Sequence, residues 1–250
     1  ARPPTPGPGV PDPVPTRSRA PCGGNRVTSP GLAEWGRDHA RTFPQARSTS
    51  SFPLPSHGSL FTGVLPAQHQ AARLRPSSGK LSPEFPTLAE RLRERGYQTA
   101  AIVSNHTYLH PQFGMDRGFE HFDLRNGSLV EHYLPLAQLT GRTLWAGHLS
   151  YRDAHSITDS ALAWLELRRA PQPFFLMLNY LDAHTPYLAR PPHDMEFEDV
   201  RLVNPVNGPR EYAELAYERK IHYLDTQVGR LLRAIEAHGL FQDTLIVITS

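Results

Sequence analysis

Apolar runs that alternate with amphipathic helices are the feature that most narrows the folds open to this chain. Each run is apolar on both faces, as buried parallel strands are. Each follows a stretch in which apolar residues recur at helical spacing. The expected helices are 85–96, 156–169 and 211–238, and the expected strands are 99–103, 173–178 and 245–248. We therefore predict an α/β fold, with a mostly parallel sheet sandwiched between helices.

In such sheets, ligands bind beyond the carboxyl ends of the strands. This rule draws attention to the loop 104–106 after the first expected strand and to the loop 182–187 after the second. The loop that would follow the third expected strand lies beyond Ser250.

The beginning of the chain has a different composition from the rest. Residues 1–28 are rich in proline and poor in apolar side chains, which predicts a disordered or polyproline-like tail. Order should begin near Ser29-Pro30, where a helix is expected, and a short strand is expected over 46–50. We therefore predict one partial α/β domain over 29–250.

Composition excludes several classes of protein. The formal net charge of the 250 residues is +2, and the arginines are scattered, so we expect no nucleic-acid partner. No apolar run approaches the ~20 residues needed to span a bilayer, so we expect a soluble chain; a cytoplasmic location fits, although nothing assigns the compartment. The single cysteine, Cys22, supports neither a disulfide framework nor a thiolate metal cluster.

The stretch 51–63, SFPLPSHGSLFTG, should deliver a polar turn onto the start of a short helix that ends at Thr62-Gly63. A helix N-terminus attracts anions because its first N–H groups have no intrahelical partner. A phosphate or sulfate group could bind there. Simple capping of the helix explains the same residues, and spacing alone leaves both interpretations open.

The second polar group of residues is the loop Asp182-Ala183-His184-Thr185-Pro186-Tyr187. His184 could act as a general acid or fixed donor toward an ester oxygen. A histidine held by local hydrogen bonds explains the position equally well. Tyr180 and Tyr187 would suit a sugar or aryl group, although packing is the more common role of aromatic residues at strand ends.

Five segments in order resemble the sulfatase family of the alkaline-phosphatase superfamily. They are 51–63, RERGYQTAAIVSN, FGMDRGFEHFD, FFLMLNYLDAHTPY and YLDTQVGRLLRAIEAHGLFQDTLIVITS. The resemblance covers about Ser29 to Ser250. It implies a hydrolase of sulfate esters, or in some relatives of phosphate or phosphonate esters, that uses a divalent cation, usually Ca²⁺, with Mg²⁺ or Mn²⁺ as alternatives.

The family supplies its nucleophile from the first position of a C-x-P-S-R or T-x-P-S-H motif, as formylglycine or threonine. On this chain the T-x-P-S-H type falls on Pro53-Leu54-Pro55-Ser56-His57, so Pro53 occupies the nucleophile position and no formylglycine can form there. Ser51 and Ser56 are nearby hydroxyls to which the nucleophile could have shifted.

The resemblance implies roles for several further residues. His57 would brace the nucleophile and the anion, and His184 would contact the sulfate and help the leaving group. Asn105 stands where many sulfatases have a lysine and could donate a hydrogen bond. Asp182 and Tyr187 are candidates for contacts to the substrate. Lys220 is loosely placed near a late sulfate-binding lysine, but an exposed helical lysine is the expected interpretation.

The family's four carboxylate or amide metal ligands have no counterpart in this chain. In the family, these ligands follow a first strand and a late strand, which here would lie before Ser29 and after Ser250. We therefore expect that the segment is truncated at both ends and that the metal ligands lie outside it. Three functions remain open: a hydrolase of small-molecule or glycan esters, a degenerate non-catalytic sulfatase fold, and a phosphoglycerol- or phosphoethanolamine-type transferase.

Overall fold

The computed structural model describes residues 17–19, 25–27, 29–43, 45–72, 79–125, 152–184 and 210–250. Side chains are described in these ranges except at 17–19, 25–27 and 210–215. The chain divides into two compact units. One consists of Ala1–Ala46 with Tyr187–Gly229, and the other of Arg47–Pro186 with Arg230–Ser250. The second unit holds the three-stranded sheet and nearly all the predicted site residues, so it is described first.

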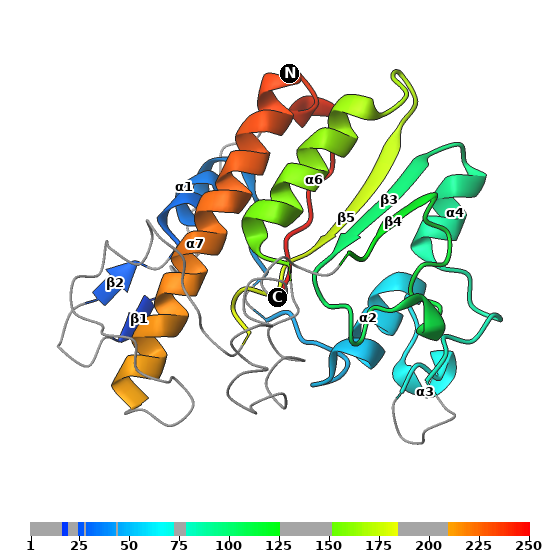
Figure 1. Ribbon diagram of the computed structural model, residues 1–250, viewed down its shortest axis with the longest axis horizontal. Coiled ribbons are helices and arrows are strands. Elements are labelled where there is room, and N and C mark those ends of the chain that lie inside the picture. Colours follow the sequence, from blue (N-terminus) through cyan, green and yellow to red (C-terminus); the bar gives the residue numbers. More distant parts are fainter. Residues whose placement is uncertain are drawn as a thin grey trace, which may run out of the picture. The chain divides into compact units, whose positions relative to one another are not determined.

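The centre of this unit is β3, Gln98–Val103, whose six residues are all buried. Strand β4, His121–Asp123, lies on one side of it, and β5, Phe174–Asn179, lies on the other. Both pairings are parallel, with Ile102 opposite Asp123 on β4 and Leu178 on β5. The three strands therefore end at the same edge of the sheet (Figure 1), as expected for an α/β fold.

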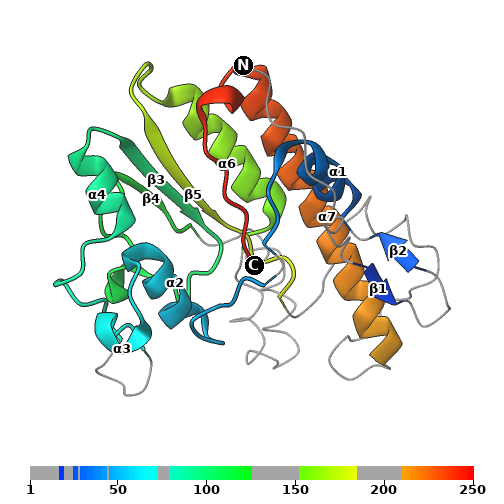
Figure 2. The same cartoon turned by 180° about the vertical axis from the view of Figure 1, so that it is seen from behind.

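The two faces of β3 pack against different helices because successive side chains of a strand point to opposite faces. Ala101 and Val103 join a cluster with Leu54 of α2, Pro53–Thr62, and Ala89 of α4, Leu88–Glu94. Ile102 joins a second cluster with α6, Ala154–Leu167, and with the end of α7, Arg210–Ala237. Figures 1 and 2 show α6 on one side of the sheet and α2 and α4 on the other, which confirms the predicted sandwich.

Shorter elements complete this unit. They are α3, Pro66–His69, and two turns of 3₁₀ helix, η1, Pro111–Phe113, and η3, Phe241–Asp243. No helix among the described residues has both the length and the apolar character needed to cross a membrane.

Two predicted strands are wrong. Residues 245–248 are extended but belong to no sheet among the described residues, and Leu245 and Val247 are 89% and 75% exposed. Only Ile246 packs against the α6 cluster. A run with strong β propensity still needs a neighbouring backbone to form a ladder, and the sequence alone does not reveal whether one is present. At 46–50 the serine hydroxyls bond the local backbone instead, as Ser48 does with Ser50.

In the other unit, α1, Pro30–His39, is held at its beginning by a side chain from α7. The N–H groups of Gly31 and Leu32 donate to the Asp225 carboxylate at 2.8 and 2.7 Å. Ser29, the N-cap residue, makes no side-chain capping bond. Asp225 therefore satisfies the free N–H groups of α1 in place of a local cap.

The predicted proline-rich tail, 1–28, contains two short strands. These are β1, Arg17–Arg19, and β2, Asn25–Val27, which pair antiparallel. The rest of the tail lies outside the described residues, so a tail that ends at 28 stays a prediction.

Candidate active site at the carboxyl ends of β3 and β5

Helix α2 begins earlier than the sequence suggested. Pro53 is its first residue, so the Pro-Ser-His segment lies within its first two turns rather than in a turn before it. The N-cap residue, Phe52, has no capping side chain, and its N–H donates to the Ser50 hydroxyl at 3.1 Å. The helix ends as expected at Thr62, followed by Gly63 with φ 75°.

The first turn of α2 has few hydrogen-bond donors to offer an anion. Pro53 and Pro55 have no N–H group, which leaves Leu54 as the donor among the first three helical residues. The N–H of Ser56 is already bonded to the Phe52 carbonyl. The helix dipole remains, but two of the three N–H groups that normally cradle an anion are absent. This sequence therefore favours a weak anion site at α2.

The Ser56 and His57 side chains both bond backbone carbonyls at the start of α2. The Ser56 hydroxyl lies 2.9 Å from the Phe52 carbonyl oxygen and 3.0 Å from that of Pro53. His57 Nδ1 lies 2.8 Å from the same Pro53 oxygen, so Nδ1 carries the proton and donates it. The Ser56 hydroxyl is thus engaged by carbonyls of its own helix.

Burial lowers the pKa of His57, and the hydrogen bond to Pro53 offsets part of this effect. The ring is half-buried and lies edge-on to Phe61, with centroids 6.2 Å apart. At neutral pH the imidazole is therefore neutral, and its Nε2 is an acceptor. A neutral His57 can accept a proton from a hydroxyl or water, but it cannot brace an anion as a cation would.

The carboxyl ends of β3 and β5 are joined through Asn179. Its side-chain oxygen accepts from the Asn105 N–H at 3.0 Å, and its backbone carbonyl accepts from the Ser104 N–H at 3.1 Å. The Asn105 side-chain oxygen accepts in turn from the Tyr108 N–H at 3.2 Å. Since the side-chain oxygen of Asn105 already accepts a hydrogen bond in the turn, its NH₂ group is the end that can donate to an anion.

The turn after β5 carries Asp182 and His184. Asp182 is fully buried, while the His184 side chain is exposed and its backbone N–H donates to the Leu181 carbonyl at 2.9 Å. Tyr187 lies outside the described residues. Asn105 and His184 therefore follow neighbouring parallel strands at one edge of the sheet, and α2 lies beside that edge in both views (Figures 1 and 2).

Tyr180, considered from the sequence as a sugar platform, is a packing residue. Its hydroxyl lies 3.0 Å from the Thr158 hydroxyl, and its ring packs on the α6 cluster. Burial raises the pKa of Tyr180 to about 12, and the nearby Asp182 carboxylate acts in the same direction.

His69, which was not predicted from the sequence, is a buried histidine that packs against α2. His69 is fully buried, with Nε2 3.1 Å from the Ser59 hydroxyl. Its Nδ1 accepts from the Ala71 N–H at 3.1 Å, so Nε2 carries the proton in the neutral ring. Gly58 lets the ring approach, because a Cβ there would lie 2.6 Å from a ring carbon. Burial lowers the pKa of His69, so it stays neutral and fixes the position of α2.

A buried charge network at the end of β4 was also missed. Arg152 and Asp123 are both buried, and a guanidinium nitrogen of Arg152 lies 3.1 Å from Asp123 Oδ2. The Arg152 carbonyl accepts from the Ser104 hydroxyl at 2.6 Å, which ties this network to the loop that carries Asn105. A three-residue strand has no periodicity to detect, and the signal in Glu120-His121-Phe122-Asp123 is limited to an aspartate that follows one apolar residue, Phe122.

Lys220 is not an exposed helical lysine as expected. It is only 2% exposed and lies 5.8 Å from the centre of the Tyr223 ring. It belongs to the unit that holds α1, whereas the three-stranded sheet belongs to the other unit.

A metal site is not assembled by the described part of the chain. Among those residues, no three or more His, Cys, Asp or Glu side chains lie close enough to hold a metal ion. Asp182 contributes a single carboxylate, whereas a hard cation needs about six oxygen ligands. The described residues therefore do not fit the cation that sulfatases use, and we derive no catalytic step through it.

Comparison with known proteins supports the fold. The chain is 24% identical over 196 residues to an N-acetylglucosamine-6-O-sulfatase of Bacteroides thetaiotaomicron, which covers 77% of this chain and 33% of that protein. Among solved structures it resembles Ps i-CgsB in complex with k-i-k-neocarrahexaose, with TM-score 0.56, 19% identity, and coverage of 77% of this chain and 46% of the other.

A second solved structure is the lipoteichoic acid synthase LtaP of Listeria monocytogenes, with TM-score 0.57, 17% identity, and coverage of 86% and 48%. The chain thus spans a third to about half of the length of these proteins. A family model described as Sulfatase matches residues 21–250. Because that match includes most of the chain and the sheet with its flanking helices, the chain belongs to the sulfatase family.

Proposed function

We propose that this chain is the ester-recognising part of a sulfatase-like hydrolase, and that the complete protein cleaves sulfate, or phosphate, esters with a divalent cation. The hydrogen bond from Asn105 N–H to Asn179 Oδ1 carries the proposal, because it fixes the loops after β3 and β5 together at the carboxyl edge of the sheet. That edge is where α/β sheets bind ligands.

Each side chain at this edge has a chemical task in the proposal. The Asn105 NH₂ group donates to the non-bridging oxygens of the bound ester. The exposed imidazole of His184 donates to the bridging oxygen as the leaving group departs. Neutral His57 accepts a proton through Nε2. The cation of the complete protein would take its ligands from outside the described residues, which assemble no metal site.

The substrate class that we propose is a sulfated glycan. One relative is named for N-acetylglucosamine 6-O-sulfate, and one structural neighbour was solved with a neocarrahexaose. Both names point to carbohydrate. Tyr187, outside the described residues, stays a candidate for a contact to the sugar.

A second candidate, a non-catalytic sulfatase fold that binds the ester without cleaving it, is favoured by the start of α2. Pro53 has no hydroxyl or thiol, and the Ser56 hydroxyl is held by helix carbonyls. Ser51 is exposed and lies two residues before Pro53, so it is the remaining position for a shifted nucleophile.

Turnover measurements separate these functions. The 250-residue chain should hydrolyse neither 4-nitrophenyl sulfate nor 4-nitrophenyl phosphate measurably, with or without Ca²⁺, because Pro53 has no hydroxyl or thiol and the described residues assemble no metal site. In the full-length protein, Pro53→Thr should raise turnover at least about tenfold, since it restores a hydroxyl at the start of α2.

The matched control is Pro66→Thr, which changes the first residue of helix α3 in the same way and should leave turnover unchanged. If the full-length Pro53→Thr variant is no more active than the unmodified protein, the missing nucleophile is not the defect. Binding of the ester without turnover in both forms would establish the non-catalytic function. Phosphoglycerol transfer to an added acceptor would establish a transferase, a possibility supported by the likeness to LtaP.

A further inference from the structure

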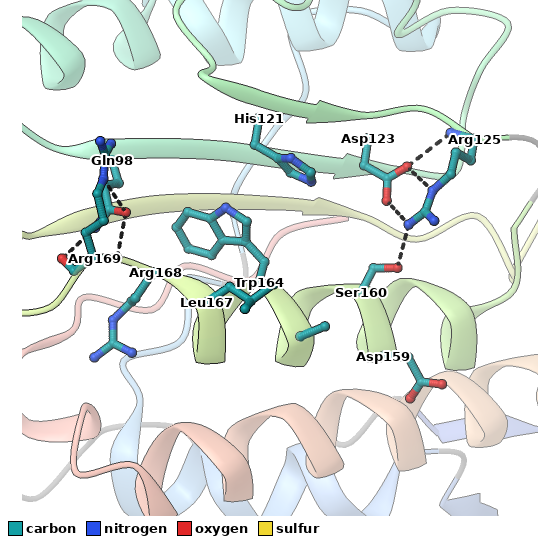
Figure 3. Close-up of a pocket in the computed structure, with 11 residues that line it drawn as sticks. Gln98, His121, Asp123, Arg125, Asp159, Ser160, Trp164, Leu167, Arg168 and Arg169 are labelled. Atoms are coloured by element: carbon teal, nitrogen blue, oxygen red, sulfur yellow. Dashed lines mark hydrogen bonds and ion pairs between the residues drawn. The ribbon is translucent and has the colours of Figure 1, made fainter.

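An open groove lies along the β4 edge of the sheet, next to α6. It has a volume of about 680 Å³, and its walls are side chains of α6, β4, the start of β3 and the two arginines after α6. Figure 3 shows Trp164 and His121 in its middle, Asp123 and Arg125 at one end, and Gln98 with Arg168 and Arg169 at the other. The function proposed above uses none of these residues.

Helix α6 uses one stripe of residues for the core and a second stripe for this groove. Ile157, Ala161 and Leu165 are buried in the core cluster. Ser160, Trp164 and Leu167 line the groove at helical spacing, and Leu167 is 84% exposed. Trp164 is held edge-on against Phe174, with ring centroids 5.9 Å apart. The groove thus has an aromatic floor that is fixed in place and still partly accessible.

Cationic groups stand at both ends of the groove. Arg168 and Arg169 lie at the amino end of β3, where Arg169 bonds the Gln98 side-chain oxygen. Arg125, mostly exposed, lies at the carboxyl end of β4. Ile102 of β3 is paired with Asp123 of β4, and the distance along β3 from Gln98 to Ile102 is about 13 Å. The two cationic ends are therefore separated by the length of a short chain of sugars.

The acidic side chains of the groove are already neutralised. Asp123 pairs with Arg125 and with buried Arg152. Asp159 pairs with Arg230 and His155. Glu120, beside the groove, pairs with Arg169. The same pairs engage Arg125 and Arg169, and Arg168 donates to the Leu165 carbonyl at 2.8 Å. The lining still has three arginines against two aspartates, an excess of one positive charge, so the groove favours an anion.

We propose that this groove is a second binding site for a sulfated oligosaccharide, with sugar rings over Trp164 and sulfate groups at the arginines of the two ends. The choice of a sulfated glycan as the occupant rests on the function proposed above. The existence of the groove is independent of that function. The Ser104–Arg152–Asp123 contacts connect its Arg125 end to the loop that carries Asn105. A glycan in the groove is thereby held next to the edge that would receive its ester.

An added polypeptide strand is the competing occupant, since β4 pairs only with β3 among the described residues. With three residues, β4 could form only a very short hydrogen-bonded ladder with an added strand. The arginines at both ends of the groove would contribute nothing to backbone hydrogen bonds in such a ladder. The groove therefore suits an anionic sugar chain better than a peptide.

The test is binding of a heparin-derived hexasaccharide to the 250-residue chain, measured by calorimetry and tryptophan fluorescence, with its chemically desulfated counterpart as the neutral probe. Arg168→Gln with Arg169→Gln should weaken binding at least about tenfold, because two charge-assisted contacts are lost. Trp164→Phe, which keeps the packing on Phe174, should abolish the fluorescence change. The matched control, Arg91→Gln with Arg93→Gln, removes two exposed arginines of α4 and should change affinity less than about twofold.

Equal binding of the desulfated probe, or equal weakening by the α4 control, would overturn the groove site. The groove site would also be overturned if His184→Gln weakened binding of the hexasaccharide while the Arg168→Gln, Arg169→Gln variant did not. That result would place the glycan at the candidate active site and would leave the proposed function intact. Binding of unrelated peptides in competition with the hexasaccharide would show that the groove receives a strand.

Discussion

Replacing Gly118 with alanine should lower the free energy of unfolding of the sheet-containing unit by about 3–5 kcal/mol. Gly118 has φ 88°, and a Cβ on it would lie 2.1 Å from the Glu90 backbone nitrogen and 2.6 Å from the Ala89 carbonyl carbon. Both atoms belong to the backbone of α4, so no side chain can move aside. The helix itself would have to shift.

The contacts around Gly118 make that shift costly. Arg117 forms a double hydrogen bond to the Glu90 carboxylate, at 3.1 and 2.9 Å, and its carbonyl accepts from the Thr87 hydroxyl at 2.9 Å. On the other side, the Gly118 carbonyl accepts from the Thr99 hydroxyl of β3 at 2.7 Å. Displacing α4 would therefore break bonds to the helix cap and to the central strand together.

Gly63→Ala is the control, because Gly63 has φ 75° but nothing within 4 Å of an added Cβ. It should cost only about 1–2 kcal/mol, the price of a left-handed conformation. The two variants can be compared by urea unfolding followed by far-UV circular dichroism. Equal losses in both would mean that the close approach of Gly118 to α4 does not exist in solution.

The second large effect should come from Asp123→Asn, at about 3–5 kcal/mol, because it leaves the buried Arg152 guanidinium without its counter-ion. Asparagine has almost the same shape, so the loss measures charge rather than packing. The exposed Asp243→Asn is the matched control and should change stability by less than about 0.5 kcal/mol.

Asp123 should also make stability depend on pH. Burial would raise the pKa of Asp123, but hydrogen bonds from Arg125 and the charges of Arg152 and Arg125 outweigh it and lower the pKa to about 2. Since this lies below the ordinary value of 3.8, the stabilisation is present above pH 3.8 and is lost as the pH falls toward 2. Between pH 4 and 2, Asp123→Asn should lose less stability than the unmodified chain. An identical loss in both would mean that Asp123 is not paired as described.

Much of the fold could be predicted because the helices and two of the strands are periodic or continuously apolar over many residues. The helices at 88–94, 154–167 and 210–237 and the strands β3 and β5 lie within a few residues of their predicted positions. β4 has three residues, too few for a pattern. The extended segment 245–248 has the composition of a strand, but pairing depends on a neighbour that its own residues do not specify.

The candidate site was harder to predict, because hydrogen bonds rather than residue types decide what its side chains can do. The sequence located Asn105, Asp182 and His184 at strand ends. It did not reveal that Asn179 joins two of these loops, that Ser56 is engaged by its own helix, or that His57 donates through Nδ1. The last two facts follow from where α2 begins, because Pro53 is its first residue and the Ser56 and His57 side chains bond carbonyls at its start.

The central claim, that the carboxyl edge of β3 and β5 recognises a sulfate ester, is tested most directly by titrating the ¹⁵N-labelled chain with N-acetylglucosamine 6-sulfate. The account predicts saturable amide shifts concentrated at Asn105, His57 and the turn 181–184. Asn105→Ala should abolish them, and unsulfated N-acetylglucosamine should not produce them. Shifts spread over other parts of the sheet, or equal shifts with the unsulfated sugar, would contradict the assignment of this edge as the ester site.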